Sequence, residues 1–269
     1  MSPILNVLLG AYGFFIMNVI LVVLSVVVTV IGGLISEMPD RTKMTDEERA
    51  AHEQLHAEVK AAGKGKADGL GENMTQKQAV KTKAFWMMWF MWLFMGSAGI
   101  SMTALATGYT ASIGIAGVMS LTAYNIMNGL SRIIAGSLSD VIGRRWVGFC
   151  AFILAAIGYA CLATGIASEI VSICICCACV GTGFGTLFAI TAPIVTDLFG
   201  LKEFGQIFGL IFTAYGFVGG IAGPLVAAAV IAVTGSYAPV FAYLAVFCVL
   251  AGVFVVFVKK PAPKGAATR

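Results

Sequence analysis

The sequence predicts an all-α membrane protein, a polytopic helical bundle with seven transmembrane helices. Of its 269 residues, 59% are hydrophobic and only 11% are charged, whereas about a quarter of the residues in soluble domains are charged. Most of the charge also falls in one segment, because nine of the 13 acidic and nine of the 17 basic residues lie between Glu37 and Lys83. The rest of the chain is apolar enough to lie in a bilayer.

Seven hydrophobic runs are long enough to cross a membrane, which takes about 20 residues of helix. They cover residues 3–36, 84–110, 115–138, 146–167, 169–197, 204–234 and 237–258. The first run far exceeds the apolar core of a signal peptide, about 7–15 residues, and no basic leader precedes it. We therefore expect it to be a membrane helix as well.

The charged segment 37–83 separates the first run from the other six. Within it, Thr45-Asp-Glu-Glu48 is typical of a capping box and predicts a short helix near 46–62. The six runs in 84–258 are joined by short connections and predict a six-helix C-terminal bundle, followed by a polar tail, 259–269.

Basic residues outside the runs all fall in alternate connections. These connections hold the loop 37–83, Arg144 and Arg145, Lys202 and the tail, whereas the opposite connections hold no Lys or Arg. The positive-inside rule predicts that the loop and the C-terminus are cytoplasmic, and we expect the membrane to be the plasma membrane. The net charge of +4 therefore reflects topology, and we expect no nucleic-acid partner. The first helix would then begin outside, which fits a receptor-like bundle but is more typical of a chain cut from a longer one.

The loop also contains His52-Glu-Gln-Leu-His56, a formal match to the zinc motif H-E-x-x-H. Its flanks are polar, no third ligand is evident, and catalysis by zinc needs a walled cavity. We interpret the match as chance on an exposed helix, and we predict neither an enzyme nor a metal site.

Two small-residue patterns predict packing. The cysteines of CICCAC, 174–179, have wholly apolar flanks and no other ligand type nearby, so they indicate soft packing residues rather than a thiolate site. Gly181, Gly183 and Gly185 lack the strand and the spacing of a nucleotide loop. Glycines at i and i+4 instead favour close approach of two membrane helices, and we predict no cofactor.

Arg132 lies well inside the third run. A membrane-embedded arginine costs at least about 2.5–3.5 kcal/mol, so we expect it to face the bundle interior and to serve a function. Helical spacing places Asn125, Asn128 and Arg132 on one face, with Tyr124 adjoining. No acidic residue lies at comparable depth in the six later runs, which makes an anionic ligand the expected partner. Snorkelling to the surface and a bond to backbone carbonyls are the alternatives.

A denser cluster follows on the same run, GSLSDVIGRR. Its Gly136, Asp140, Gly143, Arg144 and Arg145 match the signature loop of the major facilitator superfamily, G-x-L-S-D-x-x-G-R-R, which this segment resembles. In that superfamily the loop joins the second and third helices of each six-helix half. Here it joins the second and third of the six later runs.

The resemblance implies that 1–36 corresponds to the sixth helix of a transporter, 37–83 to its central loop and 84–258 to its last six helices. The N-terminal half would then be a partner outside this chain. The signature loop would act as a gate, with Asp140 near the N-terminus of the helix that begins around Phe204 and Gly205.

Four fragments are similar to the oxalate/formate antiporter group and the monocarboxylate transporters: TKAFW, NGLSR, GTGFGT and FGLIFTAYG. The resemblance implies that Arg132 binds a substrate carboxylate. By their helix face and depth, Asn125, Asn128, Tyr124 and Tyr215 are candidates to line the site. Oxalate carriers of this group place a lysine on the eleventh helix, whereas residues 204–258 contain no Lys or Arg. This difference favours a monocarboxylate or a mixed substrate over oxalate itself.

Together these features predict a secondary active transporter for small organic anions that works by alternating access. A proton (symport) or a counter-anion (antiport) would be the coupled species. The alternative is a non-transporting membrane sensor or assembly subunit derived from a transporter half.

Overall fold

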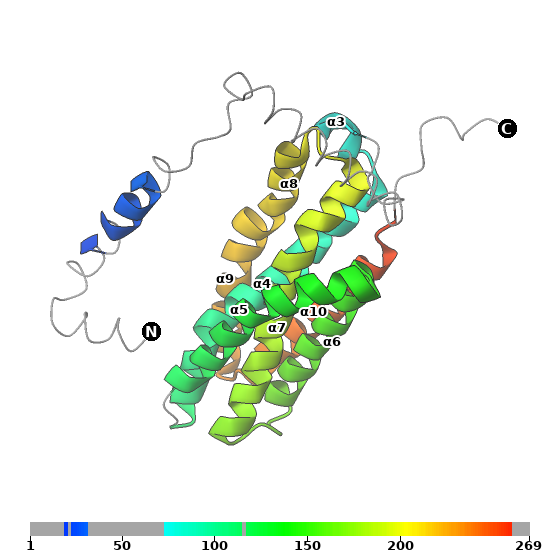
Figure 1. Ribbon diagram of the computed structural model, residues 1–269. Coiled ribbons are helices and arrows are strands. Elements are labelled where there is room, and N and C mark those ends of the chain that lie inside the picture. Colours follow the sequence, from blue (N-terminus) through cyan, green and yellow to red (C-terminus); the bar gives the residue numbers. More distant parts are fainter. Residues whose placement is uncertain (1–18, 21–22, 32–72, 115–116, 260–269) are drawn as a thin grey trace. The chain divides into compact units, whose positions relative to one another are not determined.

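The computed structural model describes residues 19–20, 23–31, 73–114 and 117–259 (Figure 1). The chain divides into two units, Met1–Gly69 and Leu70–Arg269. In the first unit the described residues are helical and exposed, and they belong to the predicted span 3–36. The rest of that span, the predicted helix 46–62 with both histidines, and residues 260–269 lie outside the described residues.

The second unit is a bundle of helices that run alongside one another (Figure 1). Its elements are α3 (Gln76–Ala79), α4 (Lys83–Ser112), α5 (Val118–Ile142), α6 (Arg144–Ala163), α7 (Ile170–Phe199), α8 (Phe204–Thr213), the π-helix η1 (Ala214–Gly219), α9 (Gly220–Thr234) and α10 (Ala238–Phe257). A helix therefore occupies each of the six later hydrophobic runs. The largest shifts are at two helix ends. α5 continues through polar residues past Leu138 until Gly143 ends it, and α6 ends at Ala163, before the predicted end at 167.

Five segments of the described chain are long and apolar enough to cross a membrane: α4, α6, α7, the continuous segment Phe204–Thr234 and α10. The fold class, an all-α polytopic membrane bundle, is confirmed. The count of seven spans is not, because α5 is not among these five segments and the first run is described only in part.

Close contact between α5 and α7 depends on glycine. A Cβ atom on Gly181 would overlap the carbonyl oxygen of Tyr124, and one on Gly185 would overlap the Asn128 carbonyl and the Ser131 hydroxyl. On the other side of α7, a Cβ on Gly183 would come within 2.8 Å of Ala155 Cβ. The predicted packing role of these glycines is confirmed. The contacts of Gly181 and Gly185 with α5 determine where along its axis α5 packs against α7.

The cysteines of α7 also behave as packing residues. Cys176 and Cys177 are buried, and Cys177 Sγ lies 3.9 Å from Met102 Sδ of α4. In the part of the chain that the structure describes, all the cysteines are free.

Hydrogen bonds tie the segment before α4 to the turn between α7 and α8. The Met74 N–H donates to the Phe199 carbonyl at 3.0 Å, and the Gln76 N–H donates to the Glu203 carboxylate at 2.7 Å. The Asn73 side-chain oxygen accepts the N–H groups of Leu201 and Lys202, each at 3.2 Å. Two of the connections that hold basic residues therefore lie at the same end of the bundle, as the charge pattern predicts.

Candidate functional site

Arg132 lies on an exposed face of α5. Its guanidinium carbon lies 4.5 Å from the centroid of the Phe188 ring of α7, close enough for a cation–π interaction. The expectation that Arg132 faces the interior is therefore not met within this chain. Among the described residues no carboxylate pairs with it.

Phe188 belongs to a cluster of aromatic rings that we call the aromatic floor. Its members are Trp92, Phe184, Phe188, Phe212 and Tyr215. Neighbouring ring centroids lie 4.9 Å apart for Trp92 and Phe188, and 5.9 Å apart for Phe188 and Tyr215. The Trp92 indole N–H donates to the Thr191 hydroxyl at 3.0 Å, which holds the floor in place under Arg132.

Tyr215 reaches this floor from the π-helix η1, which interrupts the segment from α8 to α9. Helical insertions of this kind are rare and frequently occur at functional sites. A Cβ atom on Gly219 would come within 2.7 Å of the Ser97 hydroxyl, so η1 packs tightly against α4. Sequence reasoning missed η1, although the glycine-rich segment AYGFVGG was a signal of irregular helix.

The structure separates the other predicted site residues. Tyr124 is fully buried, and its hydroxyl donates to the Gly99 carbonyl at 2.7 Å, so it joins α5 to α4 instead of lining an open site. Asn125 is exposed, and its amide donates to the Leu121 carbonyl of its own helix at 3.0 Å. Asn128 is half-buried, one turn from Arg132, and its buried Oδ1 has no partner among the described residues.

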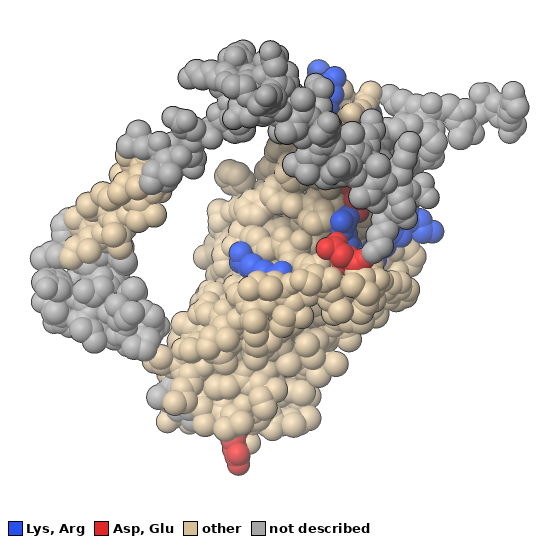
Figure 2. Space-filling view, viewed as in Figure 1, with Lys and Arg blue, Asp and Glu red and all other residues tan. Residues whose placement is uncertain are grey.

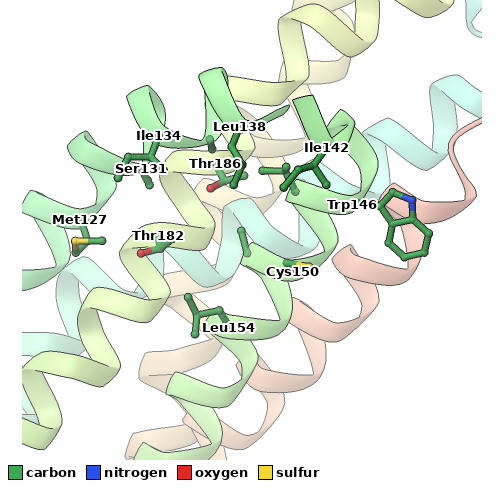
Figure 3. A pocket seen from close by; sticks show the side chains of 13 residues that line it. Met127, Ser131, Ile134, Leu138, Ile142, Trp146, Cys150, Leu154, Thr182 and Thr186 are labelled. Atoms are coloured by element: carbon green, nitrogen blue, oxygen red, sulfur yellow. The ribbon is translucent and has the colours of Figure 1, made fainter. Parts of the chain in front are cut away.

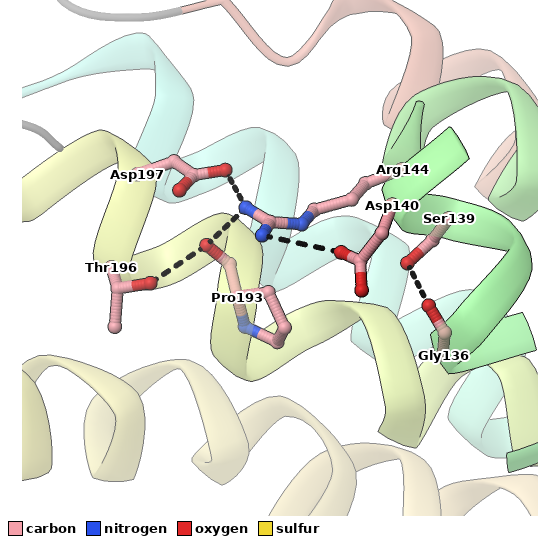
Figure 4. A network of polar contacts seen from close by, with 7 residues as sticks. All are labelled: Gly136, Ser139, Asp140, Arg144, Pro193, Thr196 and Asp197. Carbon is pink, nitrogen blue, oxygen red and sulfur yellow. Dashed lines mark hydrogen bonds and ion pairs between the residues drawn. The ribbon is translucent and has the colours of Figure 1, made fainter. Parts of the chain in front are cut away.

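The signature loop forms a second polar site (Figure 4). The Arg144 guanidinium makes an ion pair with Asp197 of α7 and donates to the Pro193 carbonyl at 3.1 Å. Its other terminal nitrogen lies 3.8 Å from the Asp140 carboxylate. These contacts tie the α5–α6 junction to the end of α7.

The remaining members of the loop have different surroundings. Gly143 has a φ of 101°, which favours glycine and explains the sharp junction. A Cβ atom on Gly136 would meet nothing within 4 Å, so packing inside the described chain does not require a glycine there. Arg145 is exposed.

Two outcomes in this loop differ from sequence reasoning. Asp140 was expected near Phe204 and Gly205, but its ion pair is with Arg144, and its side chain is 70% exposed. The sequence analysis assigns no role to Asp197, yet it is the nearest carboxylate to Arg144. Pro193 and Asp197 are one helical turn apart, so the sequence does indicate that the Pro193 carbonyl and the Asp197 carboxylate can contact the same side chain.

A groove of about 260 Å³ lies on the other flank of α5, between α5, α6 and α7 (Figure 3). Met127, Ile134, Leu138, Trp146 and Leu154 give it an apolar lining. The hydroxyls of Ser131 and Thr182 donate to carbonyls of their own helices, at 3.3 and 2.9 Å. The groove therefore offers little to an anion and is distinct from the Arg132 site.

Charge is scarce on the face of the molecule that Figure 2 shows. Figure 2 shows the acidic and basic residues as small, separate patches on a surface that is otherwise uncharged. The helical bundle is that of a polytopic membrane protein. It carries two polar sites: Arg132 over the aromatic floor, and the ion-paired junction of α5 and α6.

Comparison with known proteins identifies the family. Residues 84–269 match the Major Facilitator Superfamily, and since this match covers more than half of the chain, the protein belongs to that superfamily. The chain is also 25% identical over 149 residues to the "Uncharacterized MFS-type transporter YhjX" of Escherichia coli (strain K12). That alignment covers 54% of this chain and 37% of the relative, so the chain spans little more than a third of the relative's length.

Proposed function

We propose that this chain is the C-terminal half of a secondary active transporter for small organic anions, and that Arg132 binds the substrate carboxylate. Membership of the superfamily supports transport. The observation that carries the substrate class is the exposed guanidinium of Arg132, which has an aromatic ring beneath it and no carboxylate partner in the described chain.

The chemistry of this site suits a planar carboxylate. A guanidinium placed over an aromatic ring keeps N–H groups that can form a bidentate, charge-assisted pair with a carboxylate. Asn128, one turn away, carries an unpartnered polar atom, and Tyr215 comes from a different helix to the same floor. A monocarboxylate needs one such cation, whereas oxalate would leave a second charge without a basic partner in residues 204–258.

Transport would proceed by alternating access, with this bundle and an N-terminal six-helix bundle rocking around the bound anion. The ion pairs of Arg144 would hold the α5–α6 junction to α7 in one state and separate in the other. A proton or a counter-anion would be the coupled species, and the loop 37–83 would face the cytoplasm.

The test is uptake by proteoliposomes that contain this chain joined to an N-terminal half. We expect uptake of labelled formate or lactate to exceed that of oxalate, and Arg132→Ala to abolish it. Lys202→Gln is a matched loss of one positive charge outside the site and should transport normally. Equal uptake by the Arg132→Ala variant would rule out the proposed role.

A further inference from the structure

A pocket of about 290 Å³ opens where α4 begins. It is lined by the turn after α3, the first turns of α4 and one residue of α10: Lys81, Thr82, Lys83, Trp86, Met87, Phe90 and Phe254. None of these residues belongs to the Arg132 site or the signature loop. The pocket contains most of the TKAFW fragment, to which the proposed transport mechanism assigns no role.

The pocket combines two chemistries. Lys81 and Lys83 are exposed, and no carboxylate in the described part of the chain pairs with either ammonium group. The wall beside them is aromatic, since Phe90 stacks on Phe254 with ring centroids 5.5 Å apart. The Trp86 indole N–H is already used by the Val80 carbonyl at 3.0 Å, so this wall presents only carbon to an occupant.

The position of the pocket along α4 matches the edge of a bilayer. α4 has 30 residues, about 45 Å at 1.5 Å per residue, whereas the hydrocarbon core is about 30 Å thick. We place the first turns of α4 at the level of lipid headgroups, because they hold Lys83 and Trp86, residue types that are favoured there. Phe90 lies two turns further along the helix, about 10 Å deeper, at the level of acyl chains.

We propose that this pocket binds an anionic phospholipid, with the headgroup phosphate between Lys81 and Lys83 and an acyl chain against Trp86, Phe90 and Phe254. A free anion would gain nothing from the aromatic wall. A zwitterionic lipid would contact the same wall but would have no net charge to attract the two lysines. Basic residues near a membrane surface each add about a fivefold preference for anionic lipid.

The first experiment uses the full chain, purified in detergent, with equimolar phosphatidylglycerol and phosphatidylcholine, and counts retained lipid by native mass spectrometry. We expect preferential retention of phosphatidylglycerol. The double variant Lys81→Gln/Lys83→Gln should lose about fivefold per lysine, and Lys81→Arg/Lys83→Arg should retain the preference. The matched control, Lys77→Gln/Lys202→Gln, removes the same charge elsewhere and should behave like the wild type.

A second measurement locates the lipid. Phosphatidylglycerol with brominated acyl chains should quench tryptophan fluorescence in the wild type, and the quenched fraction should fall in Trp86→Phe. Equal retention of both lipids, equal losses in the two Gln variants, or unchanged quenching in Trp86→Phe would overturn the proposal. Displacement of phosphatidylglycerol by inorganic phosphate would also overturn it, since the site would then bind free anions.

Discussion

Arg132 and Arg144 lie twelve residues apart on consecutive helices, yet their surroundings differ completely. Arg144 has Asp197, Asp140 and the Pro193 carbonyl as partners. Arg132 has an aromatic ring and, among the described residues, no carboxylate. The charge of one arginine is used within the chain, and the charge of the other remains available to a ligand.

The difference arises from what α7 places opposite each arginine. Opposite Arg132 this helix presents Gly185, which lets α5 approach, and Phe188, one turn further along. Opposite Arg144 the same helix ends, and Asp197 and the Pro193 carbonyl provide a charge and an acceptor. An unpaired cation inside a membrane protein is costly, so its presence at Arg132 is better explained by binding than by stability.

The largest effect that would test this contrast is loss of transport in Arg132→Ala. Losing a bidentate pair should cost about 3 kcal/mol of substrate binding, roughly a hundredfold. Arg132→Lys keeps the charge but loses the fork geometry, and should retain an intermediate activity. Uptake in proteoliposomes measures the loss, and thermal unfolding should show little change because Arg132 has no ion pair to lose in the described chain. A strongly destabilised Arg132→Ala would show that the residue is structural.

A smaller effect is expected from moving α5 away from α7. Gly185→Leu would force side-chain atoms into the Asn128 carbonyl and Ser131, and overpacking of this kind typically costs about 1–3 kcal/mol. Arg132 should then lose its contact with Phe188. Unfolding of the purified chain in detergent measures the cost. Gly209→Leu is the matched control, because a Cβ atom there meets nothing within 4 Å, and equal destabilisation by both variants would contradict the packing argument.

Much of the bundle could be predicted from the sequence because bilayer thickness sets the length of each apolar run. The packing glycines could also be predicted, since small residues one turn apart have few other uses in a membrane helix. Arg132 could be singled out because a charged side chain in a membrane helix has a high free-energy cost. These inferences need only the local sequence and the properties of the lipid bilayer.

The rest depended on contacts between distant segments. A helical wheel places Tyr124 beside Asn128, but it cannot show that the Tyr124 hydroxyl reaches the Gly99 carbonyl on α4. The pair of Arg144 with Asp197 joins residues 53 positions apart, and it exists only because α6 begins where α7 ends. The π-helix η1 likewise depends on packing against α4, and the glycine-rich segment AYGFVGG indicates only that the helix is irregular there.

The Arg144 network should show energetic coupling that Arg132 lacks. In a double-mutant cycle, Arg144→Ala and Asp197→Ala should couple by about 1.5 kcal/mol, as charge-assisted hydrogen bonds do when partly buried. Arg144→Ala and Asp140→Ala should couple by less than about 0.5 kcal/mol, because Asp140 is 70% exposed and its pair is long. Unfolding of the chain by titrated denaturing detergent gives both values. Equal coupling would contradict the assignment of Asp197 as the main partner of Arg144, and stronger coupling to Asp140 would reverse it.

The smallest effects distinguish the two tyrosines. Tyr124→Phe removes a buried hydrogen bond to the Gly99 carbonyl and should lower the free energy of unfolding by about 1 kcal/mol, with the KM for substrate unchanged. The Tyr215 hydroxyl makes no hydrogen bond within the described residues, and its ring lies on the aromatic floor below Arg132. Tyr215→Phe should therefore leave stability unchanged and raise KM about fivefold, the loss of one hydrogen bond to substrate. The opposite pattern would mean that Tyr124, not Tyr215, lines the anion site.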